Sequence, residues 1–347
     1  MRRCKICLLP ETYPNISFTN GICSYCLGKT HFGVEDDEEI KKLIEKKGQL
    51  KKEFEEFIKK TKGENDYDCL LLFSGGKDST YLLYLLKEKY KLNPLALSVD
   101  TGFMNHLAKR NIKKIIKKLK VDNIFFTPGN AFFKKLYRYY LLNPGSETYC
   151  DKICGICSEV IHGIGLIEAS NRKIPCIILA NSPDQTDHYF FEIPKEKISK
   201  SWVPKEFNNN YFSKEEISHF WNPKEMDYIP RFFLPFHVIN YPGEQAIIEE
   251  LSKLNLLKKN KLSPVKTNCD LVWLLHYLDL NNKGYTPYIK NLSREIQNGK
   301  FHCNKLKKMY YTLGIKLIKS DFLKRWEKKY VLDYLDLKIK DLIKKIG

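Results

Sequence analysis

A short glycine-containing turn, Ser74 to Ser79, carries the clearest chemical pattern in the sequence. It follows an apolar run, Cys69 to Phe73, that is typical of a buried parallel strand, and it precedes an amphipathic run predicted to be a helix. A turn of this kind presents backbone N–H groups and the positive end of a helix dipole to an anion, and glycines let a phosphate come close to the backbone. Hydroxyls and one lysine add further donors. We therefore predict a phosphate-binding site at Ser74, Gly75, Gly76, Lys77, Asp78 and Ser79.

Asp78 distinguishes this turn from simpler phosphate loops. A carboxylate beside a phosphate repels it unless the carboxylate holds a divalent cation that bridges to the phosphates, so we predict Asp78 as a magnesium ligand. Asp78 also stands where the P-loop pattern requires Ser or Thr, which excludes a P-loop. We predict Lys77, Asp78 and Ser79 as the catalytic residues. An ordinary strand-to-helix turn with two glycines is the alternative.

Four cysteines near the start of the chain form two C-x-x-C pairs separated by fifteen residues, Cys4, Cys7, Cys23 and Cys26. Each pair places two thiols on one turn, and two such pairs complete a tetrahedral sulfur site for zinc. A closed site of this kind can stabilise a segment that is too small to build its own core. The sequence around them lacks the strand–helix context of a redox C-x-x-C motif.

A second cluster, Cys150, Cys154 and Cys157, has the spacing C-x3-C-x2-C just ahead of a helix predicted over 158–170. Three thiols can supply three ligands to an iron–sulfur cluster or most of a second zinc site, and a helix N-terminus favours the thiolate form. Incidental structural cysteines are the alternative. His276 is isolated in the sequence and is not predicted to be a ligand.

The elements around these residues alternate between apolar strands and amphipathic helices from residue 67 to 200. This alternation predicts an α/β fold with a doubly wound parallel sheet, whose ligands lie beyond the carboxyl ends of the strands. Three polar loops fall there: Ser74 to Ser79, Asp100 to Gly102, and Asn181 to Asp187. We predict four segments: a zinc-knuckle unit at 1–33, a linker helix at 34–66, the nucleotide domain at 67–200, and an aromatic-rich, mostly helical part with a basic end at 201–347.

The composition is that of a globular protein, with 43% hydrophobic residues and 347 residues in total. No apolar stretch of about 18 residues is evident, so we expect no membrane span, and the start of the chain does not resemble a signal peptide. A cytoplasmic location follows as the expectation. The net charge of +18 suggests an anionic partner such as a nucleic acid or nucleotide, although an overall bias toward lysine would produce the same charge.

The turn Ser74-Gly75-Gly76-Lys77-Asp78-Ser79 resembles the SGGxDS signature of the PP-loop ATP pyrophosphatases. Within this superfamily the chain is most similar to the N-acetyl sugar amidotransferases of surface-polysaccharide synthesis, above all over residues 1–100. The similarity includes both C-x-x-C pairs and the run Leu85 to Tyr90, and a weaker echo lies at 296–300. The second cysteine cluster departs from that family and instead resembles the PP-loop tRNA thiolation enzymes, which hold an iron–sulfur cluster.

The resemblance implies an enzyme that uses ATP and Mg2+, splits ATP between the α and β phosphates, and adenylates an amide or carbonyl oxygen of its substrate. It further implies that Asp100 lies at the adenosine and that the loop carrying Asn181 and Asp187 completes the nucleotide and magnesium site. The usual His-x-x-Asp-Asp form of that loop is absent here. Zinc would be a structural cofactor, and a [4Fe-4S] cluster is the alternative occupant of the second cysteine group.

Two reactions follow from this resemblance. In the first, nitrogen replaces the adenylated oxygen of an N-acetyl nucleotide sugar and forms an acetamidino group. A separate glutaminase would supply ammonia, because no glutaminase domain is recognisable in the chain. In the second, Cys150, Cys154 and Cys157 support sulfur transfer to tRNA or to a small-molecule amide, with a sulfur-donor protein as partner. A zinc-knuckle nucleic-acid-binding protein without catalysis is a third class, against which the intact Ser74 to Ser79 motif argues.

Overall fold

The computed structural model describes residues 2–28, 38–182, 191–209, 211–258, 268–287 and 327–343, and single positions 289, 293, 296, 297 and 312. The chain divides into two compact units. The first comprises Met1–Phe32, Ala131–Ile156 and Cys269–Gly347, and the second comprises Gly33–Asn130 and Cys157–Asn268. Each unit therefore combines stretches that are distant in the sequence.

The second unit is built on a five-stranded sheet in which every neighbouring pair of strands is parallel. Its order is β5-β4-β3-β6-β7, so the strand that leads into the glycine turn lies at the centre. The strands are β3 (Cys69–Leu72), β4 (Pro94–Val99), β5 (Asp122–Phe126), β6 (Cys176–Ile178) and β7 (Arg231–Phe233). This arrangement confirms the predicted α/β class with a parallel sheet.

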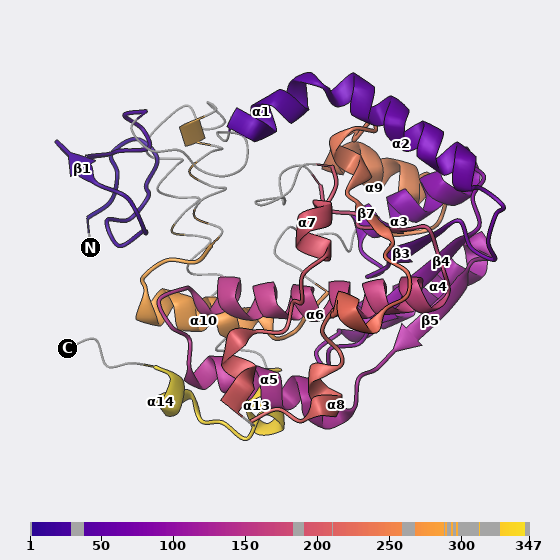
Figure 1. Ribbon diagram of the computed structural model, residues 1–347. Coiled ribbons are helices and arrows are strands. Elements are labelled where there is room, and N and C mark those ends of the chain that lie inside the picture. Colours follow the sequence, from indigo (N-terminus) through magenta and orange to yellow (C-terminus); the bar gives the residue numbers. More distant parts are fainter. Residues whose placement is uncertain are drawn as a thin grey trace. The chain divides into compact units, whose positions relative to one another are not determined.

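Alternate residues of the central strands pack on opposite faces of this sheet. On one face, Cys69 and Leu71 join a buried cluster with side chains of four helices, α2 (Lys47–Thr61), α3 (Lys77–Tyr84), α4 (His106–Leu119) and α9 (Glu244–Lys253). On the other face, Leu72 lies against Gly165 of helix α6 (Tyr149–Asn171). Both faces are therefore covered, which explains why β3 and β4 are buried at every position. The sheet with α2, α3 and α9 above it is visible in Figure 1.

The sheet has a fifth strand that the sequence analysis did not foresee. β7 lies within the aromatic-rich stretch, and Phe232 and Phe233 are both fully buried in it. Three residues are too few to show a period, and the surrounding prolines and aromatic residues conceal the strand pattern. Parallel pairing with β6, which no local signal encodes, defines it.

The first unit contains the cysteine-rich N-terminal segment and several helices. A two-stranded antiparallel hairpin, β1 (Phe18–Thr19) and β2 (Ile22–Cys23), carries one of the C-x-x-C pairs. The described helices of this unit include α5 (Asn130–Leu142), the first turns of α6, α10 (Val272–Asn282), α13 (Glu327–Tyr334) and α14 (Ile339–Leu342).

The remaining described elements are short or lie outside the sheet core. A helix, α1 (Glu38–Glu45), precedes α2, and a π-helix at Leu85–Lys89 extends α3. The short helices are α7 (Lys195–Ile198), α8 (Lys214–Ile217) and 3-10 turns at Lys205–Asn209, Pro223–Glu225 and Pro235–His237.

Helix α6 begins nine residues earlier than predicted, so the second cysteine cluster lies inside the helix and not ahead of it. The Thr148 hydroxyl accepts a hydrogen bond from the Asp151 N–H at 3.0 Å and donates to the Asp151 carboxylate at 2.7 Å. Asp279 accepts from the N–H groups of Tyr149 at 2.6 Å and Cys150 at 3.1 Å. These hydrogen bonds cap the N-terminus of α6 and explain why the helix begins earlier than predicted. The Thr-x-x-Asp spacing was visible in the sequence.

Among the described helices, α6 is long and apolar enough to cross a membrane by length and composition, with a mean hydropathy of 1.4 in its most apolar window. Core helices of soluble proteins share these properties, and half of that window is buried inside the fold. The expectation that the chain lacks a membrane span stays a prediction.

Candidate functional site

The predicted phosphate turn lies at the carboxyl end of the central strand β3, where α3 begins. Gly76 is the N-cap of α3, and Gly75 has a positive φ of 69° that a residue with a side chain rarely adopts. A Cβ atom at Gly75 would lie 2.7 Å from the Ile112 side chain and 3.1 Å from the Ala108 carbonyl oxygen. The turn therefore packs directly on helix α4, and a glycine is required at its sharpest point.

Hydroxyl groups close the two ends of this turn. The Oγ atoms of Ser74 and Ser79 lie 3.2 Å apart, and the Gly76 N–H points to the Ser74 hydroxyl at 3.4 Å. Asn268 donates from its side chain to the Ser74 carbonyl oxygen at 3.0 Å. The sequence placed the serines and glycines here, but it carried no signal for Asn268, which is distant along the chain.

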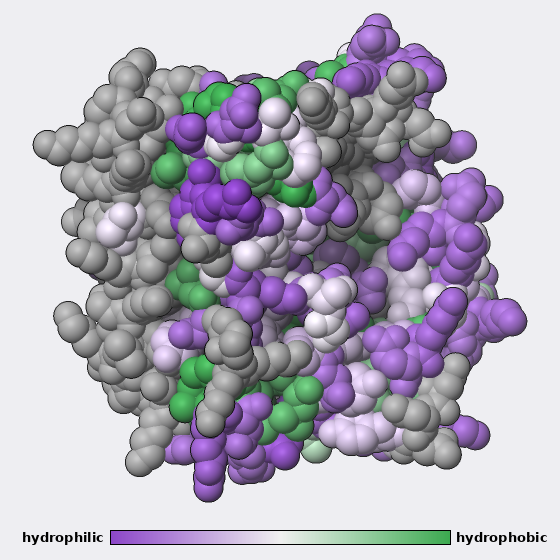
Figure 2. All heavy atoms as spheres, turned by 90° about the vertical axis from the view of Figure 1, so that its left-hand side faces the viewer, coloured by the Kyte–Doolittle hydropathy of each residue, from purple (hydrophilic) through white to green (hydrophobic). Residues whose placement is uncertain are grey.

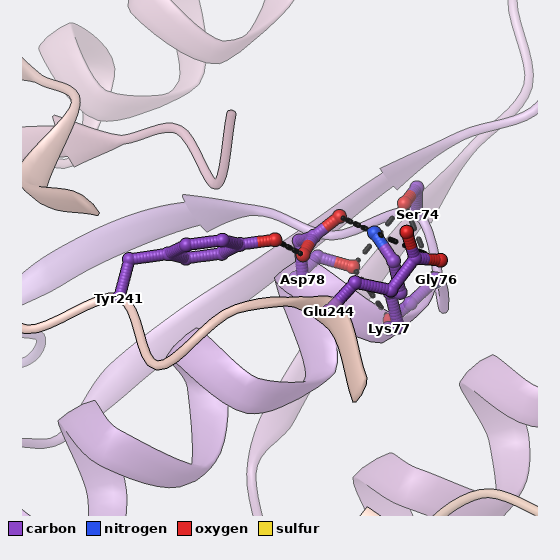
Figure 3. A network of polar contacts seen from close by, with 7 residues as sticks. Ser74, Gly76, Lys77, Asp78, Tyr241 and Glu244 are labelled. Atoms are coloured by element: carbon purple, nitrogen blue, oxygen red, sulfur yellow. Dashed lines mark hydrogen bonds and ion pairs between the residues drawn. The ribbon is translucent and has the colours of Figure 1, made fainter. Parts of the chain in front are cut away.

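Lys77 and Asp78 form a close ion pair in the first turn of α3. The Lys77 ammonium lies 2.6 Å from one Asp78 carboxylate oxygen and 3.9 Å from the carboxylate of Glu244, at the start of α9. The Tyr241 hydroxyl donates to the other Asp78 oxygen at 3.1 Å. Figure 3 shows this network, with Tyr241 and Glu244 converging on Asp78 and Lys77 from a separate segment. The sequence analysis identified neither Tyr241 nor Glu244.

These groups have the chemistry of a magnesium–phosphate site. Mg2+ takes oxygen ligands and commonly uses one or two carboxylates together with phosphate oxygens. Asp78 supplies a carboxylate beside the backbone amides of the turn. The Glu244 carboxylate lies near the Lys77 ammonium, which also pairs with Asp78. Lys77 is held within reach of both and is largely shielded, with 16% of its side chain exposed.

The other predicted nucleotide residues also follow strands of this sheet. Asp100 comes directly after β4, and its carboxylate contacts the Lys109 ammonium at 2.5 Å and the Gly102 N–H at 3.0 Å. Asn181 follows β6, the strand next to β3. Asp187 lies outside the described residues. The assignment of Asp100, Asn181 and Asp187 to nucleotide binding stays a prediction.

The four N-terminal cysteines come together as predicted. The sulfur atoms of Cys4, Cys7, Cys23 and Cys26 all lie within 4.8 Å of one another. The Cys4–Cys26 distance is 3.7 Å and the Cys7–Cys23 distance is 3.6 Å. A tetrahedron with Zn–S bonds of about 2.3 Å has edges of about 3.8 Å, so the four thiols fit one zinc ion.

The environment of these thiols favours metal binding. A hydrogen bond from Cys7 lowers the pKa of Cys4 to about 4, while the same bond and burial raise the pKa of Cys7. Gln297 donates to the Cys26 sulfur at 3.0 Å. Tyr285 and Ile289 pack against the cysteines in one buried cluster. The N-terminal segment is thus anchored within its unit by Tyr285, Ile289 and Gln297.

In the second cysteine group, the structure adds two residues that were not predicted, and the metal role of Cys150, Cys154 and Cys157 stays a prediction. Spacings of four and three place Cys150, Cys154 and Cys157 on one face of α6, and the Cys150 and Cys154 sulfur atoms are 3.9 Å apart. The ligand atoms of Cys150, His276 and Asp279 lie within 4.8 Å of one another. The prediction that His276 is isolated was wrong, because α10 carries it to Cys150.

No family model matches this sequence. A segment of 75 residues is 48% identical to an uncharacterized protein of Methanocaldococcus jannaschii, MJ1599. The match spans 21% of this chain and only 27% of that protein's length. It therefore does not assign the chain to a family.

Three solved structures show a distant likeness. The U34-tRNA thiolase NcsA from Methanococcus maripaludis, solved with its [4Fe-4S] cluster, is 15% identical with a TM-score of 0.35, covering 86% of this chain and 88% of its own. The NMN synthetase of Francisella tularensis is 14% identical with a TM-score of 0.38 over 74% and 94%. The NH3-dependent NAD synthetase of Campylobacter jejuni is 14% identical with a TM-score of 0.37 over 74% and 95%. Likeness at this level assigns no function.

Proposed function

We propose that the chain is an ATP-dependent enzyme that releases pyrophosphate and adenylates an oxygen atom of its substrate. The observation that carries this proposal is the glycine turn at the end of β3, where Lys77 and Asp78 form an ion pair at the N-terminus of α3. Such a turn at the carboxyl edge of a parallel sheet is suited to binding a triphosphate. The resemblance to the SGGxDS signature implies that the bond between the α and β phosphates of ATP is cleaved.

Each residue of the turn has a role in this reaction. The backbone amides of the turn and the hydroxyls of Ser74 and Ser79 would bind the phosphates, and Lys77 would balance the charge that develops as pyrophosphate leaves. Asp78, with Glu244 beside it, would hold Mg2+, which neutralises the phosphates when bound. The protein contributes position and charge, and the substrate oxygen is the nucleophile.

The reaction that we propose is nitrogen transfer to an N-acetyl nucleotide sugar in the cytoplasm. The acetamido oxygen attacks the α-phosphorus of ATP, and pyrophosphate leaves with the electron pair of the broken bond. Ammonia from a partner glutaminase then attacks the activated carbon, and AMP leaves carrying the former acetamido oxygen. The product is an acetamidino sugar, and the nitrogen loses its extra proton to solvent.

Sulfur transfer is the second candidate, because three cysteines share one face of α6. In that reaction a sulfur donor would replace ammonia, and the acceptor would be tRNA or a small-molecule amide. The net charge of +18 suits a nucleic-acid acceptor but also a nucleotide.

Isotope transfer tests the proposed reaction directly. The purified chain is incubated with ATP, Mg2+, ammonium and a UDP-N-acetylhexosamine that carries 18O in its acetamido group. We expect AMP with one 18O atom, detected by mass spectrometry, together with pyrophosphate in equal amount. AMP formation without the label would show water attack and would overturn adenylation of the amide. If 18O appeared in AMP only when a sulfide donor replaced ammonium, the reaction would be sulfur transfer.

A further inference from the structure

The residues that surround Cys150 form a cluster that no local sequence pattern predicts. Its members come from the first turns of α6 and from α10, two helices of the same compact unit. The ligand atoms of Cys150, His276 and Asp279 lie within 4.8 Å of one another, and the Cys154 sulfur is 3.9 Å from that of Cys150. One thiol, an imidazole and a carboxylate are therefore gathered at one point, and a second thiol lies beside the first.

Helix geometry holds these four groups in place. Cys150 and Cys154 are one turn apart on α6, and His276 and Asp279 are three residues apart on α10, so each pair faces in one direction. Asp279 accepts hydrogen bonds from the N–H groups of Tyr149 and Cys150, which fixes its carboxylate at the start of α6. Carboxylates that are fixed in this way are typical supports or ligands of metal sites.

The burial of the cluster requires a compensating charge. Asp279 is fully buried and His276 is 2% exposed, with Leu274, Leu275 and Leu278 buried beside them on α10. A buried carboxylate is costly unless it is paired or bound to a metal ion. A divalent cation would offset two of the three negative charges that Asp279 and two thiolates carry together.

We propose that Cys150, His276 and Asp279 bind a second zinc ion that joins α6 to α10, and that the neighbouring Cys154 thiol completes the site as the fourth ligand. Zinc accepts sulfur, imidazole nitrogen and carboxylate oxygen in one tetrahedral shell, whereas iron–sulfur clusters are held predominantly by thiolates. The site has four protein ligands, so its role is structural. It links two stretches of chain more than a hundred residues apart, as the backbone bonds from Tyr149 and Cys150 to Asp279 already do.

This ligand set differs from the three-cysteine set that the sequence suggested. Among the described residues, the group of closely spaced ligand atoms is Cys150, His276 and Asp279; of the other two cysteines, Cys154 has its sulfur 3.9 Å from that of Cys150, and Cys157 is not part of the group. The two sets can therefore be separated by experiment: Cys157 is dispensable in the zinc site and essential in a three-cysteine cluster. The inference does not depend on the proposed reaction.

Metal analysis of the full-length chain, purified without oxygen, tests the second site. We expect about two zinc ions per chain and no iron by mass spectrometry of the metal content. His276→Ala and Asp279→Ala should each lower this to about one, while Cys157→Ala and the exposed control His106→Ala should leave it at two. Iron in the purified chain, or loss of metal with Cys157→Ala but not with His276→Ala, would overturn the proposal.

X-ray absorption on the unmutated chain provides a test that no folding defect can obscure. With one all-sulfur site and one mixed site, the average zinc shell should contain about three sulfur atoms and one nitrogen or oxygen atom. A shell of four sulfur atoms with one zinc per chain would show that only the N-terminal site is filled and would overturn the proposal.

Discussion

Asp78 forms an ion pair with Lys77, and we propose it as the magnesium ligand. One of its carboxylate oxygens contacts the Lys77 ammonium at 2.6 Å, and the other accepts a hydrogen bond from the Tyr241 hydroxyl at 3.1 Å. We expect Asp78→Asn to lower the rate of pyrophosphate release by 10²-fold or more, because an amide cannot replace a carboxylate as a magnesium ligand. The measurement is pyrophosphate release at saturating ATP and increasing Mg2+.

Tyr241→Phe is the matched control, since it removes one hydrogen bond to Asp78 and keeps the carboxylate. We expect a change of about tenfold or less, in keeping with the net value of a single hydrogen bond. If Asp78→Asn were no slower than Tyr241→Phe, Asp78 would not be the magnesium ligand.

Gly75 tests the shape of the turn without altering any charged group. Its φ of 69° and the 2.7 Å approach of a Cβ to Ile112 leave no room for a side chain. We expect Gly75→Ala to weaken ATP binding by tenfold or more and to destabilise the fold by about 1–3 kcal/mol. Gly129→Ala is the control, because a Cβ there would meet nothing within 4 Å. If calorimetry gave the same ATP affinity for Gly75→Ala and Gly129→Ala, the close packing of the turn on α4 would be contradicted.

At the scale of residues, the sites that are formed by neighbouring residues could be predicted from the sequence. The turn from Ser74 to Ser79 and the four N-terminal cysteines are patterns of spacing, and the structure gathers each as expected. Glu244 and His276 could not be found in this way, because their position depends on how α9 and α10 pack. Only tertiary structure brings Glu244 to Lys77 and His276 to Cys150.

Helix α6 carries the second cysteine group at one end and supports the sheet at the other. Its close packing depends on two glycines that face neighbouring segments. A Cβ at Gly163 would lie 2.8 Å from the backbone nitrogen of Trp221, and a Cβ at Gly165 would lie 2.9 Å from a Leu72 methyl group. Gly163 meets backbone, which cannot move aside as a side chain can.

We therefore expect Gly163→Ala to destabilise the protein by about 2–4 kcal/mol, measured by urea denaturation. Gly155→Ala, on the same helix, should be neutral or stabilise by up to about 1 kcal/mol, because nothing lies within 4 Å of its Cβ and alanine favours the helix. Similar stabilities for the two variants would show that α6 does not pack this closely on the Trp221 segment.

At the scale of elements, the strands and helices with strong periods were predictable and the context-dependent ones were not. β3 and β4 are buried apolar runs, and α4 follows its amphipathic pattern to within one residue. The start of α6 was predicted nine residues too late, because part of its cap comes from Asp279, which is distant in the sequence. β7 was missed because pairing with β6, and not its own three residues, makes it a strand.

The whole molecule should lose stability as the pH falls, and His237 is one identifiable cause. Burial, and then the nearby charge of Lys47, lower the pKa of His237 to about 4. The unfolded chain has a histidine pKa near 6.5, so between about pH 6.5 and 4 the unfolded state binds more protons than the folded state. Stability is therefore complete above about pH 6.5 and decreases toward pH 4, by on the order of 3 kcal/mol from this residue.

His237→Gln should flatten this part of the pH profile, measured as the free energy of unfolding from pH 7.5 to 4.5. His106→Gln, at an exposed position at the start of α4, should leave the profile unchanged. An unchanged profile for His237→Gln would indicate that the pKa of this imidazole is the same in the folded and unfolded chain.

One face of the molecule shows how polar and apolar side chains are distributed among the described residues. On the face drawn in Figure 2, hydrophilic side chains predominate among the described residues, and hydrophobic ones appear in small groups. The net charge of +18 alone does not choose between a nucleotide sugar and a nucleic acid as partner. The identity of the acceptor has to be determined by assaying the reaction with candidate acceptors.

Division of the chain into two units predicts that metal removal acts on one of them. The first unit contains the four N-terminal cysteines, packed with Tyr285 and Ile289 in a small cluster, and the second has the larger core around the sheet. A structural zinc site contributes about 10–16 kcal/mol, which exceeds the total free energy of unfolding of most domains.

We expect a strong chelator to remove amide protection in residues 2–28 and 272–287, measured by hydrogen exchange and mass spectrometry. Protection in β3 and β4 should remain, because their parallel pairing and burial involve no metal ligand. Simultaneous loss of protection in both regions would show that the two units unfold together, and unchanged protection in residues 2–28 would show that the cysteines are not held by a metal ion. Addition of zinc should restore the original pattern, which separates metal loss from damage by the chelator.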